Sequence, residues 1–164
     1  MTRGTNYVSI PAKSEDIMTT PQPRWHGLDM LPTFSQVVDG MADSAQELYA
    51  SLQQAKSRPT SLDDATVGRA IAMYSEQQEF YTYYQEQLAR WLRAQPTVRQ
   101  RAEIERLQSV MQILVPTAAR LLRLAQKLAP YTIEKVMAMP DADVGMMYLS
   151  GGLVVTEDDE DATS

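Results

Sequence analysis

Apolar residues recur along the chain at alternating steps of four and three positions in three separate segments. In the first segment they are Phe34, Val38, Met41, Ala45, Leu48 and Leu52. In the second they are Val67, Ile71, Tyr74, Tyr81, Leu88 and Leu92, with Gln78 and Gln85 interrupting the pattern. In the third they are Ile104, Leu107, Met111, Leu114, Ala118, Leu121, Ala125 and Leu128. Because this spacing places side chains on one face of an α-helix, as in coiled coils, it predicts three long amphipathic helices.

Helix starts are predicted where a hydroxyl residue precedes, by three positions, a residue that can return its hydrogen bond. The three pairs are Thr33 with Gln36, Ser61 with Asp64, and Thr97 with Gln100. Such pairs resemble capping boxes, which satisfy backbone N–H groups at a helix start. Pro59 and Pro96 lie just before two of these starts and disfavour helical geometry in the residue before them.

The short links at 57–60 and 95–96 predict that consecutive helices run antiparallel. The expected fold is all-α: an antiparallel three-helix bundle with a short C-terminal helix near 132–139. On these boundaries the first helix is ~34 Å long and the second ~50 Å. Residues 86–108 are therefore expected to project as a helical hairpin. Its apolar seam would be covered by the N-terminal arm, a second copy or a partner.

The ends of the chain differ in composition from the middle, and the expected organisation has three parts. Residues 1–30 contain Pro11, Pro21 and Pro23 and show no apolar period, which predicts a flexible arm that Trp25 and Leu28 could dock onto the bundle. The bundle itself is expected to span 31–150. Residues 151–164 are expected to form an acidic tail, whose last part, 156–164, cannot bury apolar area.

Composition narrows the possible chemistry. The chain has 164 residues, no Cys and one His, His26, so thiol chemistry and a His-based catalytic or metal site are not expected. No phosphate-binding glycine loop is present, and we expect no cofactor and no enzymatic activity. No apolar run approaches the ~20 residues needed to cross a bilayer, so a soluble cytoplasmic protein is the expectation.

The net charge of −6 conceals a basic middle, because residues 90–127 contain eight basic and two acidic residues. The hairpin tip is accordingly a candidate surface for an anionic partner. Its residues are Arg90, Trp91, Arg93, Arg99, Arg101 and Arg106. The partner could be a nucleic acid or an acidic protein. Alternatively, the arginines form a solvated face that pairs with acidic side chains of this chain.

Aromatic residues are concentrated in the second helix, and Phe80, Tyr83, Tyr84 and Trp91 form a candidate association surface. The alternative is that they are core residues with a few tyrosines on the surface. A further candidate is the apolar run Leu153, Val154 and Val155, which precedes five acidic residues and could add as a strand to a partner. Otherwise the tail only aids solubility, or it folds back and masks the arginine tip.

These features favour a non-enzymatic protein–protein interaction role, as an adaptor or assembly factor that forms homo-oligomers through its helical seams. The alternative is an accessory protein that binds nucleic acid through the arginine tip, with the acidic tail as an intramolecular competitor. Salt-sensitive binding to arbitrary DNA or RNA would favour the second role, and salt-tolerant oligomerisation the first.

Overall fold

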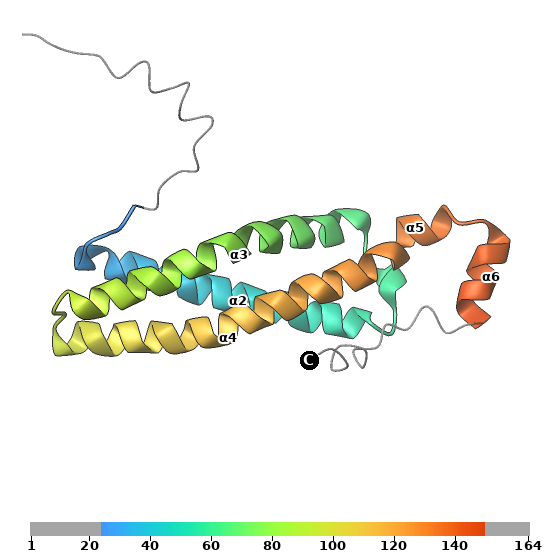
Figure 1. Ribbon diagram of the computed structural model, residues 1–164. Helices are drawn as coiled ribbons and strands as arrows, with labels where there is room; N and C mark the ends of the chain where they lie inside the picture. The colour runs from blue at the N-terminus through green and yellow to red at the C-terminus, as the bar shows by residue number, and fades with distance from the viewer. Residues whose placement is uncertain (1–23, 150–164) are drawn as a thin grey trace, which may run out of the picture.

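The computed structural model describes residues 24–149, and this part of the chain is helical without a strand (Figure 1). The long helices are α2 (Leu31–Ala55), α3 (Asp64–Arg93) and α4 (Val98–Leu128), followed by the short helices α5 (Ile133–Met137) and α6 (Asp141–Leu149). Single 3₁₀ turns occur at η1 (Leu28–Met30), η2 (Pro59–Ser61) and η3 (Ala129–Tyr131). The prediction of an all-α protein is confirmed for these residues.

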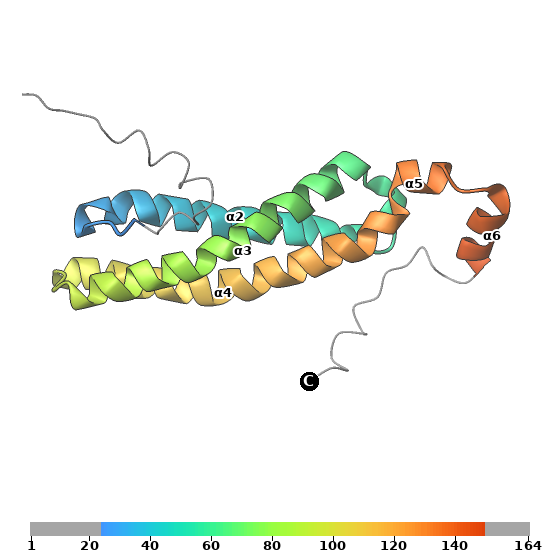
Figure 2. The same cartoon turned by 45° about the horizontal axis from the view of Figure 1, so that its top comes forward.

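The helix α4 is the centre of the bundle, because it packs along both α2 and α3 (Figures 1 and 2). All eight positions of its predicted apolar stripe are buried, together with Leu124. The helix continues through Pro116 without a break. A helix that packs against neighbouring helices on two sides buries all of its apolar stripe. The apolar period of such a helix therefore predicts its buried residues.

The stripes of α2 and α3 are buried less completely. In α2, four predicted positions are buried, and Met41 and Leu48 lie partly buried against the core. In α3, Ile71 and Leu92 are partly buried in the same way. The core extends beyond the predicted α3 stripe to Ala70, Gln87 and Trp91.

One of the three predicted helix starts is confirmed. Thr97 caps α4 in a capping box: the Gln100 amide donates to the Thr97 hydroxyl over 3.1 Å, and the Thr97 amide donates to Gln100 Oε1 over 2.9 Å. Thr33 is inside α2, which begins at Leu31 with Pro32 in its first turn, where a missing N–H costs nothing. The cap of α3 is Asp63 and not Ser61, and its carboxylate accepts from the Thr66 amide at 2.6 Å.

The short helix predicted near 132–139 is present as α5, and it is fastened to the start of α3. The Asp64 carboxylate accepts hydrogen bonds from the Thr132 hydroxyl and from Lys135 Nζ, the second over 2.9 Å. These two bonds hold the pKa of Asp64 below its ordinary value. The Ile133 amide also donates to the Leu62 carbonyl over 3.0 Å. The α5 segment therefore closes the end of the bundle where α3 begins.

The expectation that residues 86–108 project beyond the first helix is not met, because the helix lengths differ from those predicted. The turn η1 and α2 together extend ~44 Å, and α3 extends ~45 Å. Phe34 near the start of α2 reaches Trp91, with ring centroids 5.0 Å apart. Residues 24–34 of the same chain thus cover the apolar seam of the hairpin. Of the three coverings that we expected, this corresponds to the N-terminal arm rather than to a second copy or a partner.

Candidate functional site

Residues 24–27, here called the strap, run in extended conformation along the C-terminal half of α3. The Trp25 ring stacks on the Tyr83 ring, with centroids 5.1 Å apart and planes 15° apart. The Arg90 guanidinium carbon lies 4.0 Å from the Trp25 ring centroid, within the range of a cation–π contact. The Tyr83 hydroxyl donates to the carbonyl of Arg24. The docking predicted for Trp25 is therefore present, and Tyr83 and Arg90 form the surface that receives it.

The backbone of His26 is held by two side chains that lie in the core. Gln87, only 1% exposed, accepts from the His26 amide at 2.8 Å and donates to the His26 carbonyl over 3.3 Å. The Trp91 indole N–H donates to the same carbonyl over 2.8 Å. Each buried polar group thus has a partner, as burial requires. The apolar periodicity of α3 did not identify Gln87 as a buried residue. The burial of Gln87 follows from a second segment whose backbone N–H and C=O need hydrogen-bond partners.

The candidate association surface is largely used within the chain. Trp91 is buried, and its ring lies edge-on to Phe34. Tyr84 packs edge-on against Phe34 and Tyr83, with centroids 5.2 and 5.7 Å apart. Phe80 alone among the four candidates is exposed. The structure therefore assigns three of these aromatic residues to intramolecular packing.

The tip arginines divide into paired and unpaired groups. Arg90 and Arg93 both contact Glu86, at 3.3 and 3.4 Å. Arg99 and Arg101 are exposed and form no ion pair within residues 24–149. Trp91 is buried and lies apart from this surface.

Arg106 takes part in a three-residue cluster that links α4 to α2. Its two terminal nitrogens donate to the two oxygens of Asp39 over 3.0 and 2.9 Å. It also donates to Glu103 over 2.6 Å, and this bond lowers the pKa of the Glu103 carboxyl. The bidentate geometry is that of a strong charge-assisted pair. Positive charge at the tip is therefore mostly balanced by acidic neighbours, as in the solvated-face interpretation.

An open groove of about 730 Å³ lies beside the tip, between the start of α2 and the start of α4. Leu28, Leu31, Pro32 and Ala102 line it, with Arg99 among its polar residues. Leu28, the second residue expected to dock the arm, thus lies at this groove and packs against the core.

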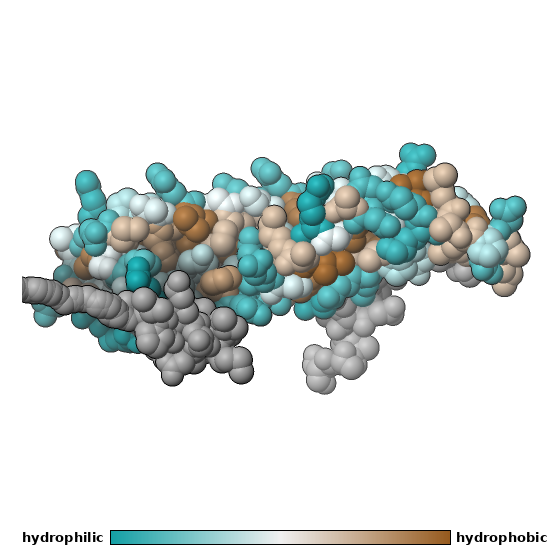
Figure 3. Space-filling model, turned by 90° about the horizontal axis from the view of Figure 1, so that it is seen from above, coloured by the Kyte–Doolittle hydropathy of each residue, from teal (hydrophilic) through white to brown (hydrophobic). Residues whose placement is uncertain are grey.

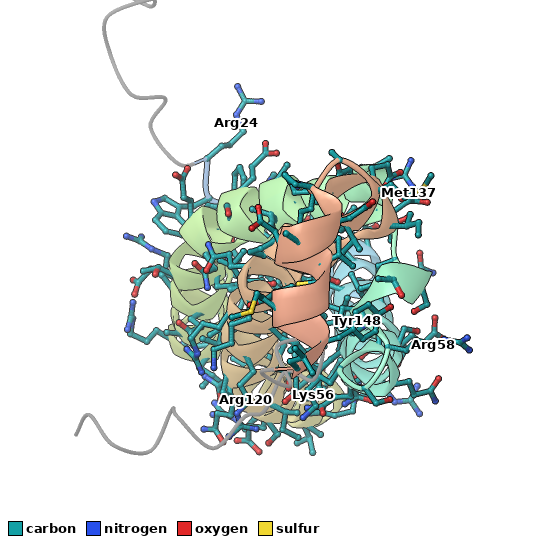
Figure 4. The ribbon with its side chains drawn as sticks, turned by 90° about the vertical axis from the view of Figure 1, so that its right-hand side faces the viewer. Arg24, Lys56, Arg58, Arg120, Met137 and Tyr148 are labelled. Carbon is teal, nitrogen blue, oxygen red and sulfur yellow. The ribbon has the colours of Figure 1, made fainter. Side chains whose placement is uncertain are left out.

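The opposite end of the molecule carries exposed apolar side chains. The helix α6 crosses this end, and none of its nine residues is buried (Figure 4). Its exposed large side chains are Met146, Tyr148 and Leu149, the last of which is 85% exposed. Met137 of α5 is 77% exposed at the same end. Apolar surface accordingly gathers over α5 and α6 at the right of Figure 3.

Charged residues surround this apolar end. Lys56 and Arg58 belong to the link between α2 and η2, at the end of the bundle where α5 packs (Figure 4). Asp141 and Asp143 occupy the first turn of α6, where the helix dipole favours negative charge. This end of the molecule therefore carries both acidic and basic side chains. Met137 and Met146 contribute to this surface, which the periodicity of the three long helices did not identify.

Leu153, Val154 and Val155 lie outside the described residues. Within residues 24–149, no group of three or more His, Asp or Glu side chains is arranged to hold a metal ion. No helix in this part of the chain has the length and apolarity to span a bilayer. Comparison of the chain with models of protein families, with curated protein sequences and with solved structures gave no match.

Proposed function

We propose that this chain is a non-enzymatic interaction protein, an adaptor or assembly factor, that self-associates through its α5–α6 end. The observation that carries the proposal is the exposure of α6. An isolated helix of nine residues is marginal in water, and helices in proteins gain most of their stability from packing an apolar face. Because none of the α6 residues is buried, a second protein surface would supply that packing.

The exposed side chains suit an association surface. Tyr148 combines a large apolar ring with a polar hydroxyl, and methionine adapts its shape to irregular partners. Met146 and Leu149 are exposed in the same short helix as Tyr148, and Met137 of α5 is exposed at the same end of the molecule. Single apolar side chains are normal on protein surfaces, whereas several at one end favour an interaction site.

Charge complementarity favours a second copy as the partner. In a two-fold arrangement, α6 of one copy would lie antiparallel to α6 of the other. The acidic first turn with Asp141 and Asp143 would then approach the end of the other copy that carries Lys56 and Arg58. This pairing of unlike charges steers association and fixes its register.

The nucleic-acid alternative has less support, because Arg90, Arg93 and Arg106 are paired with acidic side chains. The tip and α6 lie at opposite ends of α4, which is ~46 Å long, so the surface proposed here is separate from the arginine tip (Figure 1).

The test is the concentration dependence of molar mass, measured by light scattering and sedimentation for the wild-type chain and for a Met146→Glu, Leu149→Glu variant. We expect a dimer for the wild type and a monomer for the variant. Since neither residue is buried, the variant should keep the circular dichroism of the wild type. The control is Val98→Glu, an equally exposed apolar residue at the opposite end, which should leave the dimer intact.

A charge exchange tests the orientation of the pair. Reversing Asp141 and Asp143 to Lys should weaken association, and so should reversing Lys56 and Arg58 to Glu. In a pair made of one chain of each variant, both contacts again join unlike charges, so an equal mixture should associate more strongly than either variant alone. A wild-type chain that stays monomeric up to about 0.5 mM, where even weak dimers with Kd near 0.1 mM would be populated, would rule out self-association.

A further inference from the structure

The strap and the surface that receives it have the chemistry of a peptide and its receptor. Tyr83, Gln87, Arg90 and Trp91, here called the strap receptor, follow each other at helical spacing along the last turns of α3. They contact one aromatic ring and the backbone of the adjacent residues. The side chain of His26 is exposed and has no part in these contacts. The receptor therefore selects a tryptophan and an extended backbone rather than one particular sequence.

The strap lies on the surface of the bundle and is open to replacement. Trp25 keeps 37% of its surface exposed, and residues 24–27 are all exposed. By contrast, Gln87 and Trp91 are buried beneath the strap and rigidly placed by α3. A site whose receptor is rigid and whose occupant is an exposed extended segment can exchange that occupant for one of the same chemistry.

We propose that the strap receptor binds an extended tryptophan-bearing segment of a partner protein, and that the chain's own strap is a built-in competitor for it. The partner segment would place its tryptophan against Tyr83 and Arg90. The next residue would present its backbone N–H and C=O to Gln87, and that carbonyl would also accept from the Trp91 indole. This site lies at the tip, at the opposite end of the molecule from the proposed self-association surface (Figure 1).

Competition by the strap sets the size of the expected effect. A partner binds only the fraction of molecules whose receptor is open, so its apparent Kd rises as that fraction falls. A strap that is closed in nine molecules of ten weakens binding ~10-fold relative to a chain with a disabled strap. Trp25→Ala disables the strap by removing its aromatic anchor, and it leaves every residue of the receptor unchanged.

The experiment uses the full chain labelled with ¹⁵N and a synthetic peptide with the sequence of residues 20–30. The chain contains two tryptophans, so the Trp25→Ala variant has a single indole N–H signal, that of Trp91. Titration with the peptide should shift this signal to saturation, with a Kd at least ~10-fold lower than that of the wild type. A peptide in which alanine replaces its tryptophan should cause no shift, and neither should the first peptide added to a Trp25→Ala, Gln87→Leu chain.

Absence of a shift in the folded Trp25→Ala chain at about 1 mM peptide would overturn the proposal, because a Kd above that value would leave the site almost empty at micromolar partner concentrations. If Trp25→Ala does not fold, Trp25→Phe retains a ring against Tyr83 and is titrated in the same way, with the same two outcomes. Indole signals that change with wild-type protein concentration alone would show that a second copy's strap is the occupant, which also overturns the partner assignment. The mass measurements at the α6 end are independent of all three results.

Discussion

Replacing Phe34 by alanine tests whether the start of α2 holds the end of the α3–α4 hairpin. Phe34 is 8% exposed, and its ring packs edge-on against both Tyr84 and Trp91. Truncating a buried phenylalanine costs about 3–5 kcal/mol, and part of this loss is the contact between aromatic rings. Because Phe34 lies near the end of the bundle, where neighbours can relax, we expect a loss of about 3 kcal/mol in the free energy of unfolding.

The matched control is Phe80→Ala, the same change at the second phenylalanine of the chain. Phe80 is 48% exposed, so its truncation should cost only about 1 kcal/mol. Urea unfolding followed by circular dichroism measures both variants. With an m value near 1.5–2 kcal/mol per M, Phe34→Ala should lower the midpoint by about 1.5–2 M. Equal losses for the two variants would refute the reasoning, because they would mean that Phe34 does not cover a buried seam.

Three further predictions concern single residues. Thr97→Ala should cost about 1 kcal/mol in urea unfolding because it removes the capping box of α4, whereas Thr33→Ala should cost almost nothing, and a reversed order would return the helix start to Thr33. Gly40→Ala should add about 0.5–1 kcal/mol, since a methyl group there meets no atom within 4 Å and alanine favours the helix; a lower urea midpoint would contradict this. Burial raises the pKa of Tyr81 from 10.0 to about 12. The unfolded chain loses that proton first as pH rises, so stability should fall between pH 10 and about 12, by about 2 to 3 kcal/mol in total. Urea midpoints at about pH 9 and pH 11.5 should show this fall in the wild type and a smaller one in Tyr81→Phe.

The core of α4, apart from Leu124, could be predicted from the sequence, for a physical reason. Its stripe from Ile104 to Leu128 is set by the helical period alone, and α2 and α3 both pack onto it. The capping box at Thr97 is equally local, because its two hydrogen bonds join residues three positions apart. Features that depend on a few neighbouring residues leave a direct trace in the sequence.

The burial of Gln87 and Trp91 could not be predicted in the same way, because it depends on residues more than 60 positions away. Both lie beside the apolar stripe of α3, and their polar groups are paired with the backbone of His26. Periodicity describes one helix at a time and contains no information about such docking. The available signal was Trp25, a large aromatic residue in a segment otherwise rich in proline.

The error in the predicted hairpin came from two helix ends that were each displaced by two or three residues. Thr33 and Ser61 both match the capping pattern, yet Pro32 and Asp63 fix the actual starts. Each displacement is small, but together they made the first helix too short and the second too long. The predicted difference in length between the two helices left an uncovered apolar seam that the structure does not contain. The exposed surfaces inferred from a sequence therefore depend strongly on where the helices are predicted to end.

If the chain self-associates as proposed, the two ends of the bundle should separate stability from association. At the tip, the aromatic side chains pack against the strap and against Phe34, so substitutions of these residues should mainly lower the free energy of unfolding. At the other end, no residue of α6 is fully buried and Met146 and Leu149 are exposed, so changes at these two should leave unfolding almost unchanged and alter molar mass instead. A single surface that served both purposes would couple the two measurements. We therefore expect the two measurements to be uncoupled. Variants at the tip should be less stable but still associated, and variants in α6 should be stable but monomeric.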